Sequence, residues 1–474
     1  MPKATKIIAT IGPATESEEA MNALIRAGMN VARFNTKHSD PIWHKTMILR
    51  MRQVAEGLHE SVAILLDLQG PEIRLNVPGG QPFLVQSGQV VRFVTTEGAT
   101  NPIEPIVPPL VISSLQKDHS ILIDDGMGEF VVEEIGPDYL LARAQSQFYV
   151  KDRKTLNTPG VVMDLPSLIE RDMAVLDQMT DGMVDFVGLS MVRNQSDIEI
   201  LRQELSRRQI QAHIVAKIEN QSALDNIDQV IGSSDAVMVA RGDLGVEVAY
   251  QELTFWQKTI ITKCRNAGRP VITATQMLKS MVDNPRPTRA EVSDVAHAIY
   301  DGTDAVMLSE ETTIGQYPID AVMVQHTIAA FNETHATYLP FTPITATDTE
   351  RIAHATIQLA QTSRDQAEPV SKIICFTETG LTAKLLARYR PHIPIIALTS
   401  NTLTYHTLSM VYGVEPHVIN LDDNHRLDSD DALRAILTQY NLIAPTDRCL
   451  VLHGILWKNP GKTNTMSLLS PTQL

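Results

Sequence analysis

The sequence predicts an α/β protein: a (β/α)8 TIM barrel with an inserted small β-barrel lid domain and a carboxy-terminal α/β sheet domain. Three observations support this prediction: eight short apolar runs that end in polar residues, a β-rich insert that interrupts them, and alternating helical and apolar stretches in the last third of the chain. In a (β/α)8 barrel the active site lies at the carboxyl ends of the strands. The polar ends of the eight runs are therefore candidates for a functional site.

The eight candidate strands are rich in Val, Ile, Leu and Ala, which is typical of parallel strands buried on both faces. Apolar residues at helical spacing separate most of them and predict helices over 18–27, 196–207 and 255–266. A doubly wound sheet is the alternative, but it does not need eight matched strand ends. The predicted strands lead to Thr10, Asn35, Asp67, Ser190, Glu219, Arg241, Thr275 and Ser309.

A segment without helical period interrupts the barrel pattern after the third run. It is β-rich over 83–94 and 130–141, and Pro71 and Pro166 flank it. A separate β-domain on two hinges beside the strand ends is expected to act as a lid. In the last third, apolar runs over 371–376, 394–398, 417–420 and 449–453 alternate with helical stretches and predict an α/β sheet. The predicted domains are 1–70 and 166–339 for the barrel, 71–165 for the lid and 340–474 for the carboxy-terminal domain.

Composition excludes several classes of protein. The 474 residues carry a formal net charge of -15 with no basic tract, which argues against nucleic acid and anionic membranes as partners. The 3 cysteines are too few and too widely spaced for a disulfide framework or a zinc ribbon, which favours a reducing compartment. No charged-then-apolar leader and no apolar run of membrane-spanning length occurs. A cytoplasmic protein is therefore expected.

Two of the predicted strands end in charged residues, in Ile-Val-Ala-Lys217-Ile-Glu219 and Met-Val-Ala-Arg241-Gly242-Asp243. Strand alternation places Lys217 and Glu219 on one face. Glu219 and Asp243, at adjacent strand ends, are oxygen ligands of the hard type that Mg²⁺ and Mn²⁺ prefer, and two solvated loop carboxylates are the alternative. A salt bridge between Lys217 and Glu219 is compatible with either interpretation.

The second predicted strand adds further polar groups. Arg33, Asn35 and Lys37 alternate and so share a face, and the planar guanidinium of Arg33 suits phosphoryl oxygens. Glycine at 242 and 245 lets the backbone approach a ligand closely, although this pattern alone is only a weak turn signal. Cations, carboxylates and a flexible corner together favour a divalent metal beside an anionic substrate, as phosphoryl transfer requires.

Taken together, these motifs resemble those of the pyruvate kinase family along essentially the whole chain. Any one of them is weak, but eight in the expected order are hard to obtain by chance. The matching segments are 10–13, 33–35, 70–74, 217–220, 240–247, 273–277, 284–291 and 301–308.

The resemblance implies transfer of phosphate from phosphoenolpyruvate to ADP, with Mg²⁺ or Mn²⁺ held by Glu219 and Asp243, and commonly a homotetramer. It also implies that the loop of Arg286 and Arg289 lies at a subunit contact, whereas capping-box spacing explains Thr288 and Glu291. The implied substrate contacts are Arg33, Ser190, Lys217, Gly242, Asp243 and Thr275, with Arg33, Lys217 and Thr275 in catalysis, and the implied nucleotide contacts are Asn35, His38, Arg74 and Lys154.

A second site is predicted near the carboxy terminus, where a hydroxyl-rich loop follows an apolar run. Hydroxyls and backbone N–H groups that converge at a helix start can bind phosphate, although an ordinary hydroxyl cap explains them equally well. The resemblance implies a sugar-phosphate or nucleotide effector held between this loop and a later one. The predicted effector residues are Thr377, Thr379, Gly380, Thr382, Trp457, Lys458 and Lys462.

The chain departs from the family at a monovalent-cation site. Most relatives carry serine at Lys37 and many carry threonine at Leu68, where these residues hold potassium together with Asn35 and Asp67. Relatives that need no potassium often carry lysine at the position of Glu72 and leucine at that of Leu68, so this chain mixes two patterns. We predict that the Lys37 ammonium, tethered near Asp67 and Asn35, replaces potassium. The alternative is that Lys37 points into solvent and the cation site is lost.

Other functions remain open at this stage. A barrel lyase or aldolase would use the same carboxylate pair to hold a metal beside a pyruvate enolate, but it would not need nucleotide contacts from a lid. A catalytically silent effector-binding protein is suggested by Lys37 and by Glu310, a position where relatives have a small residue. An added carboxylate at 310 would either perturb the metal site or face away from it.

Overall fold

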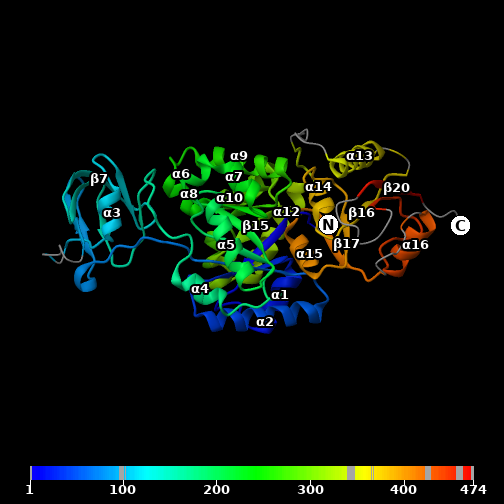
Figure 1. Ribbon diagram of the computed structural model, residues 1–474, viewed down its shortest axis with the longest axis horizontal. Helices are drawn as coiled ribbons and strands as arrows, with labels where there is room; N and C mark the ends of the chain where they lie inside the picture. Colours follow the sequence, from blue (N-terminus) through cyan, green and yellow to red (C-terminus); the bar gives the residue numbers. More distant parts are fainter. Residues whose placement is uncertain are drawn as a thin grey trace.

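The computed structural model describes residues 3–95, 101, 103–338, 347–364, 366, 368–421, 427, 429–454 and 463–470. Three units follow one another along the long axis of the molecule (Figure 1). The inserted β-domain lies at one end, the barrel is central, and the carboxy-terminal sheet lies at the other end. Each unit contains its own buried apolar cluster. The predicted boundaries at 70/71 and 165/166 stay predictions, and the one at 339/340 touches residues outside the described ranges.

Eight parallel strands close into a barrel in the order β1-β15-β14-β13-β12-β11-β3-β2, which confirms the predicted fold class. Every predicted barrel strand is present. Their carboxyl ends form the rim and their amino ends form the base. The strands are β1 (Lys6–Thr10), β2 (Val31–Asn35), β3 (Ala63–Asp67), β11 (Phe186–Leu189), β12 (His213–Ile218), β13 (Ala236–Ala240), β14 (Val271–Ala274) and β15 (Ala305–Leu308).

Helices surround the barrel, and the three predicted from apolar spacing are present with ends that shift by two residues at most. The first of them begins at an N-cap serine, Ser17, and ends at Gly28, whose φ of 113° is readily adopted only by glycine. The helices of this unit are α1 (Glu18–Ala27), α2 (Pro41–Leu58), α4 (Glu170–Leu176), α5 (Gln195–Arg207), α6 (Gln221–Asp225), α7 (Ile227–Ser233), α8 (Arg241–Glu247), α9 (Leu253–Ala267), α10 (Arg289–Asp301), α11 (Glu310–Thr313) and α12 (Pro318–Glu333), with a 3₁₀ turn, η3 (Lys279–Val282).

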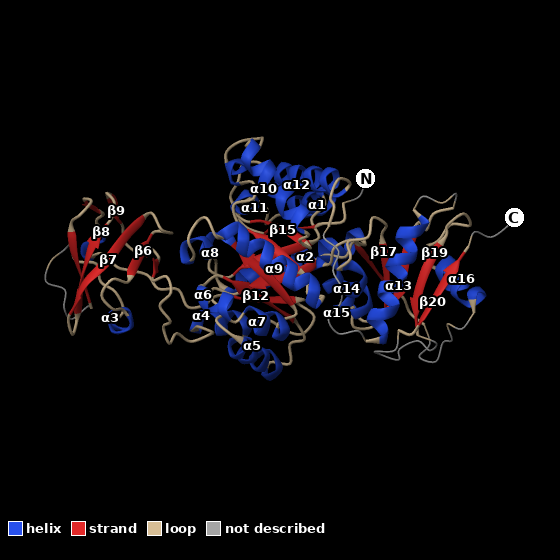
Figure 2. Cartoon of the chain, turned by 90° about the horizontal axis from the view of Figure 1, so that it is seen from above, coloured by secondary structure: helices blue, strands red, loops and turns tan. Residues whose placement is uncertain are grey.

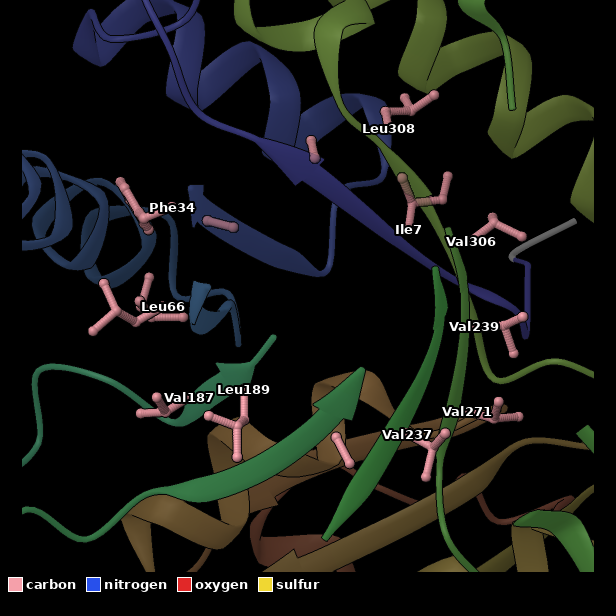
Figure 3. Close-up of a cluster of buried hydrophobic side chains, with 14 of the residues drawn as sticks. Ile7, Phe34, Leu66, Val187, Leu189, Val237, Val239, Val271, Val306 and Leu308 are labelled. Atoms are coloured by element: carbon pink, nitrogen blue, oxygen red, sulfur yellow. The ribbon is translucent and has the colours of Figure 1, made fainter. Parts of the chain in front are cut away.

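Strand alternation separates the barrel residues into two apolar layers. Residues such as Ile7, Phe34 and Leu66 belong to the layer packed against the surrounding helices (Figure 3). Their neighbours Ile8 and Leu65 belong to the cluster that fills the barrel. The same alternation, continued to the rim, carries polar side chains to the mouth of the barrel.

The inserted domain is antiparallel. Its main sheet has the order β10-β6-β7-β8-β5, and β4 pairs with β9. Phe130 packs edge-on against Phe93 and Phe148 with ring centroids 5.0 and 5.2 Å apart, which fixes the two sheets against each other. Its elements are η1 (Pro78–Gly80), β4 (Phe83–Val85), β5 (Val90–Val94), α3 (Pro109–Ser114), β6 (Ser120–Ile123), β7 (Gly128–Ile135), β8 (Tyr139–Ala144), β9 (Phe148–Val150) and β10 (Leu156–Asn157).

The carboxy-terminal unit is a five-stranded sheet in the order β18-β17-β16-β19-β20. Its outer strand β18 begins at 414, three residues before the predicted run at 417, because Glu415 and Pro416 interrupt the apolar pattern, and an edge strand tolerates both. The elements are α13 (Asp348–Ser363), β16 (Lys372–Phe376), α14 (Leu381–Ala387), β17 (Ile395–Thr399), α15 (Thr402–Thr407), a 3₁₀ turn η4 (Leu408–Met410), β18 (Val414–Val418), α16 (Asp430–Gln439), β19 (Cys449–His453) and β20 (Thr465–Leu469).

Helices α14 and α15 lie between the barrel and the carboxy-terminal sheet (Figure 2). Met410, which is fully buried, belongs to the apolar cluster inside the barrel and so contributes to its base. The guanidinium of Arg390 forms an ion pair with Asp304 at 2.8 Å beside it. Within the described ranges, no helix combines the length and apolar character needed to cross a membrane.

Candidate active site

The rim carries a buried network of charges contributed by neighbouring strands. Asp67, at the end of β3, lies 2.7 Å from the Arg33 guanidinium and 3.4 Å from the Lys217 ammonium. The Lys217 ammonium also donates to Ser190 Oγ at 2.6 Å and pairs with Glu219 at 2.9 Å. The structure therefore brings together the predicted residues Arg33, Ser190, Lys217 and Glu219 around Asp67.

Burial acts differently on the two signs of charge in this network. Burial alone would lower the pKa of Lys217, but the carboxylates of Asp67 and Glu219 outweigh it and raise that pKa above its ordinary value. Burial would likewise raise the pKa of Asp67, but Lys217 and Arg33 hold it below its usual range. Lys217 and Asp67 are therefore both charged at neutral pH. The rim thus holds two cations, Lys217 and Arg33, beside the Asp67 carboxylate.

Glu219 and Asp243 form the predicted carboxylate pair. Glu219 is almost completely buried, and its second oxygen accepts a hydrogen bond from the Met191 backbone N–H at 2.6 Å. Desolvation and the Glu219 carboxylate raise the pKa of Asp243 to about 7, although part of the Asp243 side chain faces solvent. A carboxyl group that keeps its proton up to about pH 7 beside a second carboxylate fits a divalent cation, whose charge would replace that proton.

In the described part of the chain, no group of three or more His, Cys, Asp or Glu side chains is arranged to hold a metal. The pair of Glu219 and Asp243 offers two ligand residues, which matches the habit of Mg²⁺ to keep waters and to use substrate oxygens as further ligands.

Helix α8 begins at the rim and carries Gly242 in its first turn. The Gly242 N–H donates to Thr275 Oγ1 at 2.8 Å, and the Arg241 guanidinium donates to the Thr275 carbonyl at 2.7 Å. Thr275 has a φ of 70°, a left-handed conformation that is costly for a β-branched residue. The surrounding contacts therefore hold the Thr275 hydroxyl in place at the cost of backbone strain, next to Gly242 as predicted.

The structure places Lys37 differently from the prediction. Its ammonium pairs with Glu72 at 2.7 Å and not with Asp67, whose ion-pair partners are Arg33 and Lys217. Only the backbone N–H of Lys37 contacts Asn35, by donating to Oδ1 at 3.2 Å. The prediction that Lys37 is tethered near Asp67 is therefore wrong, because Glu72 is within reach and Asp67 is already paired.

The other predicted residues of this region are held by protein partners. The carbonyl of Leu68 accepts a hydrogen bond from Ser190 Oγ at 2.7 Å. Arg74 shares Glu72 with Lys37, at 2.6 Å, and the Lys154 ammonium pairs with Asp124 inside the lid at 2.7 Å. His38 is exposed, and partial burial and the nearby Lys37 charge lower its pKa. The structure does not bring Lys154 into contact with Asn35, His38 or Arg74.

A cleft of about 1060 Å³ lies between the lid and the rim. Asp243 and Asn220 line it from the barrel, and Glu72 and Asn157 line it from the lid side. Asn157 donates a hydrogen bond to Glu247 of α8 at 3.2 Å, so one contact joins the lid to the helix that carries Asp243. The cleft gives Asp243 access to a ligand, whereas Arg33, Lys217 and Glu219 do not line it.

Two further residues support the site: Thr10, which was predicted only as a strand end, and Asp172, which was not predicted. Thr10 Oγ1 accepts a hydrogen bond from Arg33 at 2.9 Å, and the carboxylate of Asp172 accepts from the backbone of Gln69 and Gly70. Asp172 orders the loop after β3, but an aspartate near a helix start is too common to be singled out. For Thr10, its position at a barrel-strand end was the available signal.

Two open questions about rim residues are answered by contacts. Glu310 pairs with Lys279 and both side chains are half exposed, so its carboxylate is engaged on the surface and not with Glu219 or Asp243. Thr288 and Glu291 form the expected capping box at the start of α10. Arg286 and Arg289 are exposed, and their role at a subunit contact stays a prediction.

The predicted effector loop is only partly described. Thr377 and Thr382 are buried, and Gly380 has a φ of 76°. Thr382 Oγ1 lies 2.9 Å from the hydroxyl of Thr463, so the loop does meet the segment before β20. Thr379 is exposed. The predicted residues Trp457, Lys458 and Lys462 lie outside the described ranges.

Comparison with known proteins agrees with this geometry. Residues 2–322 match the family described as "Pyruvate kinase, barrel domain", and residues 350–469 match "Pyruvate kinase, alpha/beta domain". The chain belongs to the pyruvate kinase family. Among its relatives, the pyruvate kinase of Geobacillus stearothermophilus is 38% identical over 99% of this chain and 80% of its own length. The pyruvate kinase of Staphylococcus aureus strain MRSA252 is 39% identical over 98% of this chain and 80% of its own length.

Solved structures lead to the same family. The crystal structure of a pyruvate kinase from Cryptosporidium parvum superimposes with a TM-score of 0.89, covers 99% of this chain and 96% of its own, and is 34% identical in sequence. Family membership makes the protein a phosphotransferase with phosphoenolpyruvate and ADP as substrates. The family generally requires a divalent cation.

The raised pKa of Asp243 predicts that divalent-metal affinity depends on pH. Because Asp243 must lose its proton before it can ligate a cation, Mn²⁺ should bind more tightly as pH rises toward and through about 7. Below the pKa the affinity should fall by up to about tenfold for each pH unit. Titration of the metal-free enzyme with Mn²⁺ between pH 5.5 and 8, followed by calorimetry, measures this. An affinity that does not change with pH would contradict the raised pKa of Asp243.

Proposed function

We propose that this protein transfers the phosphoryl group of phosphoenolpyruvate to ADP at the rim cluster of Arg33, Lys217, Glu219, Asp243 and Thr275. The observation that carries the proposal is the Lys217 ammonium, which lies within 3.4 Å of Asp67, Glu219 and Ser190 at the rim of the barrel. Phosphoryl transfer depends on positioning and charge neutralisation, and this cluster offers both in a desolvated place.

Each group has a distinct task in this proposal. Arg33 holds the phosphoryl oxygens, and Asp67 fixes the direction of its guanidinium. Lys217 faces the phosphoryl group and then the enolate oxygen that remains when the bond between phosphorus and oxygen breaks. Thr275 and the backbone at Gly242 bind the substrate carboxylate. Glu219 and Asp243 would hold Mg²⁺ or Mn²⁺, which when bound neutralises charge on the transferring group.

The nucleotide is proposed to enter from the lid side. Asn35, His38 and Arg74 lie near the rim, and Lys154 comes from the domain proposed to close over it, residues 71–165. Lys154 would exchange Asp124 for a nucleotide phosphate, because its present partner is a single half-exposed carboxylate. Closure would exclude water from the transferring group. As in much of the family, a homotetramer in the cytoplasm is proposed.

The catalytic assignment is tested by replacing Lys217. Lys217→Met removes one preorganised charge and should lower kcat by on the order of 10²-fold or more. Lys263→Met is the matched control, because Lys263 lies on the surface of α9 and pairs with the exposed Asp228. A coupled assay of ADP-dependent pyruvate formation measures both variants. Near-normal turnover of Lys217→Met would contradict the catalytic assignment.

We also propose that the enzyme works without potassium, because Lys37 supplies a tethered positive charge at the rim. Glu72, which Arg74 also contacts, fixes the position of the ammonium, and Lys37 lowers the pKa of Asp243 through space. The charge therefore acts on the metal-binding carboxylates from the side of Glu72 rather than from beside Asp67. This differs from the expected position but keeps the expected role.

Salt dependence tests this role. Activity should be similar in sodium, potassium and tetramethylammonium salts, whereas Lys37→Ser should slow the enzyme and introduce a response to potassium. Lys117→Ser, on the exposed surface of the lid, is the control. The double variant Lys37→Ser, Glu72→Lys places a lysine at the other position of the Lys37–Glu72 ion pair. This variant should regain activity in sodium. Strong potassium activation of the unaltered enzyme would refute the proposal.

Regulation is proposed to act through the loop of Thr377, Thr379, Gly380 and Thr382, which would bind a phosphorylated metabolite together with the segment of Trp457, Lys458 and Lys462. The contact between Thr382 and Thr463 supports it by joining the two segments. The Glu378 carboxylate does not oppose it, because the backbone N–H and hydroxyl of Ser400 engage it.

A panel of sugar phosphates and nucleotides should change the substrate response for at least one compound, and Gly380→Asp should abolish that change. The control is Gly380→Ala, because any Cβ here is strained at this φ and lies 3.2 Å from Leu408. The aspartate should therefore remove the response more completely than the alanine through charge repulsion. If no compound alters the kinetics, the loop is structural.

A further inference from the structure

A second cluster of charges lies at the base of the barrel, at the opposite end of the strands from the rim. A small cleft with an empty volume of about 200 Å³ lies where the end of α9 meets α14 and the chain that follows it. Helix α14 lies at the junction of the two units (Figure 2). The residues that line the cleft are Arg265, Gly268, Arg269, Pro270, Asp304, Lys384, Arg388, Arg390 and Val411.

The charges that line this cleft are unbalanced. Five of the lining residues are cationic and one, Asp304, is anionic. Asp304 is fully engaged, because it pairs with Arg390 and accepts hydrogen bonds from the backbone N–H groups of Val271 and Tyr412. It therefore neutralises one of the five cations and has no capacity for another.

Two of the remaining cations are not neutralised by a neighbouring carboxylate. The Arg269 guanidinium donates to the carbonyl of Gly232 at 3.2 Å, a neutral acceptor. The Lys384 ammonium has neither a hydrogen bond nor an ion pair with the described residues. The negative charge of Asp235 acts on Lys384 without contact. Asp235 already pairs with Arg202 and accepts a hydrogen bond from the Ile214 N–H. Arg388 differs, since it pairs with Glu350 at 3.1 Å.

This imbalance has an electrostatic cost. Burial, with a further contribution from Arg269, lowers the pKa of Lys384 to about 8. Buried charges without compensation destabilise a folded protein, and an anion among them would reverse that effect.

We propose that the cleft binds one small inorganic anion between Lys384 and Arg269. Ammonium and guanidinium groups bind phosphate and sulfate oxygens through charge-assisted hydrogen bonds, and they also attract chloride. The cleft is too small for a sugar phosphate, which argues for a bare ion. Because Arg269 belongs to the barrel and Lys384 to the carboxy-terminal unit, the ion would bridge the two.

The proposal is tested by thermal unfolding in a buffer that contains neither chloride nor phosphate. Titration with inorganic phosphate, and separately with sodium chloride against sodium gluconate at equal ionic strength, should raise the unfolding midpoint in a saturable way. Lys384→Met should lose that rise and, without either ion, should be at least as stable as the unaltered enzyme because a repulsive charge is gone. Lys263→Met, the same exchange on the exposed face of α9, should keep the rise.

A further variant separates this site from the catalytic one. Lys217→Met removes a phosphoryl-binding charge at the rim but should keep the rise, so failure of the catalytic proposal would not mimic failure of this one. If Lys384→Met does not fold, Arg269→Gln takes its place. A rise with only one of the two ions supports the proposal and identifies the ion. No saturable rise with either, or an unchanged rise in Lys384→Met and Arg269→Gln, overturns it.

Discussion

The buried carboxylate of Asp67 is the interaction on which the active site depends. It is 1% exposed and contacts both cations of the rim, Arg33 and Lys217. An isolated carboxylate in this place would be protonated, and two isolated cations would repel each other. Together they remain charged and keep a fixed direction. Arg33 on β2 and Lys217 on β12 are separated along the barrel, so the closed sheet is what lets one aspartate serve both.

The rest of the rim follows from that arrangement. Asp67 neutralises part of the positive charge of Arg33 and Lys217. The contact between Lys217 and Glu219 therefore does not neutralise Glu219 and Asp243 completely. The pKa of Asp243 is raised, because burial and the neighbouring Glu219 carboxylate disfavour a second negative charge there. A divalent cation is therefore attracted to the carboxylates, and the phosphoryl group to Arg33 and Lys217. The divalent cation and the phosphoryl group are thus expected to bind to different residues of the rim.

Much of the fold could be predicted because it depends on short-range patterns. Parallel strands buried on both faces appear as uninterrupted apolar runs, and all eight were found. The capping residues around α1 are local as well. The predicted start of strand β18 was three residues too late. It is an edge strand, where Glu415 and Pro416 destabilise the sheet little and interrupt the apolar pattern. Which residues reach the rim could be predicted, since strand alternation determines it.

Partner choice could not be predicted, because it depends on the path of loops. Lys37 has two carboxylates within its general neighbourhood, and only the course of the chain after β3 shows that Glu72 is available while Asp67 is taken. The left-handed backbone of Thr275 has no sequence signal either, since threonine rarely adopts it. The pairing of Arg390 with Asp304 joins residues that are distant in sequence and follows no motif. Such contacts are consequences of tertiary structure.

The two ends of the barrel show the same electrostatic design with different outcomes. At each end, one buried aspartate pairs with basic side chains: Asp67 with Arg33 and Lys217 at the rim, and Asp304 with Arg390 at the base. At the rim, Glu219 and Asp243 add negative charge, so the cluster suits a divalent cation beside an anionic substrate that arrives and leaves. At the base, Lys384 and Arg269 add positive charge beside a small cleft between two structural units. The rim therefore favours binding and release of a metal and a substrate, whereas the base would favour a bound anion that joins the two units.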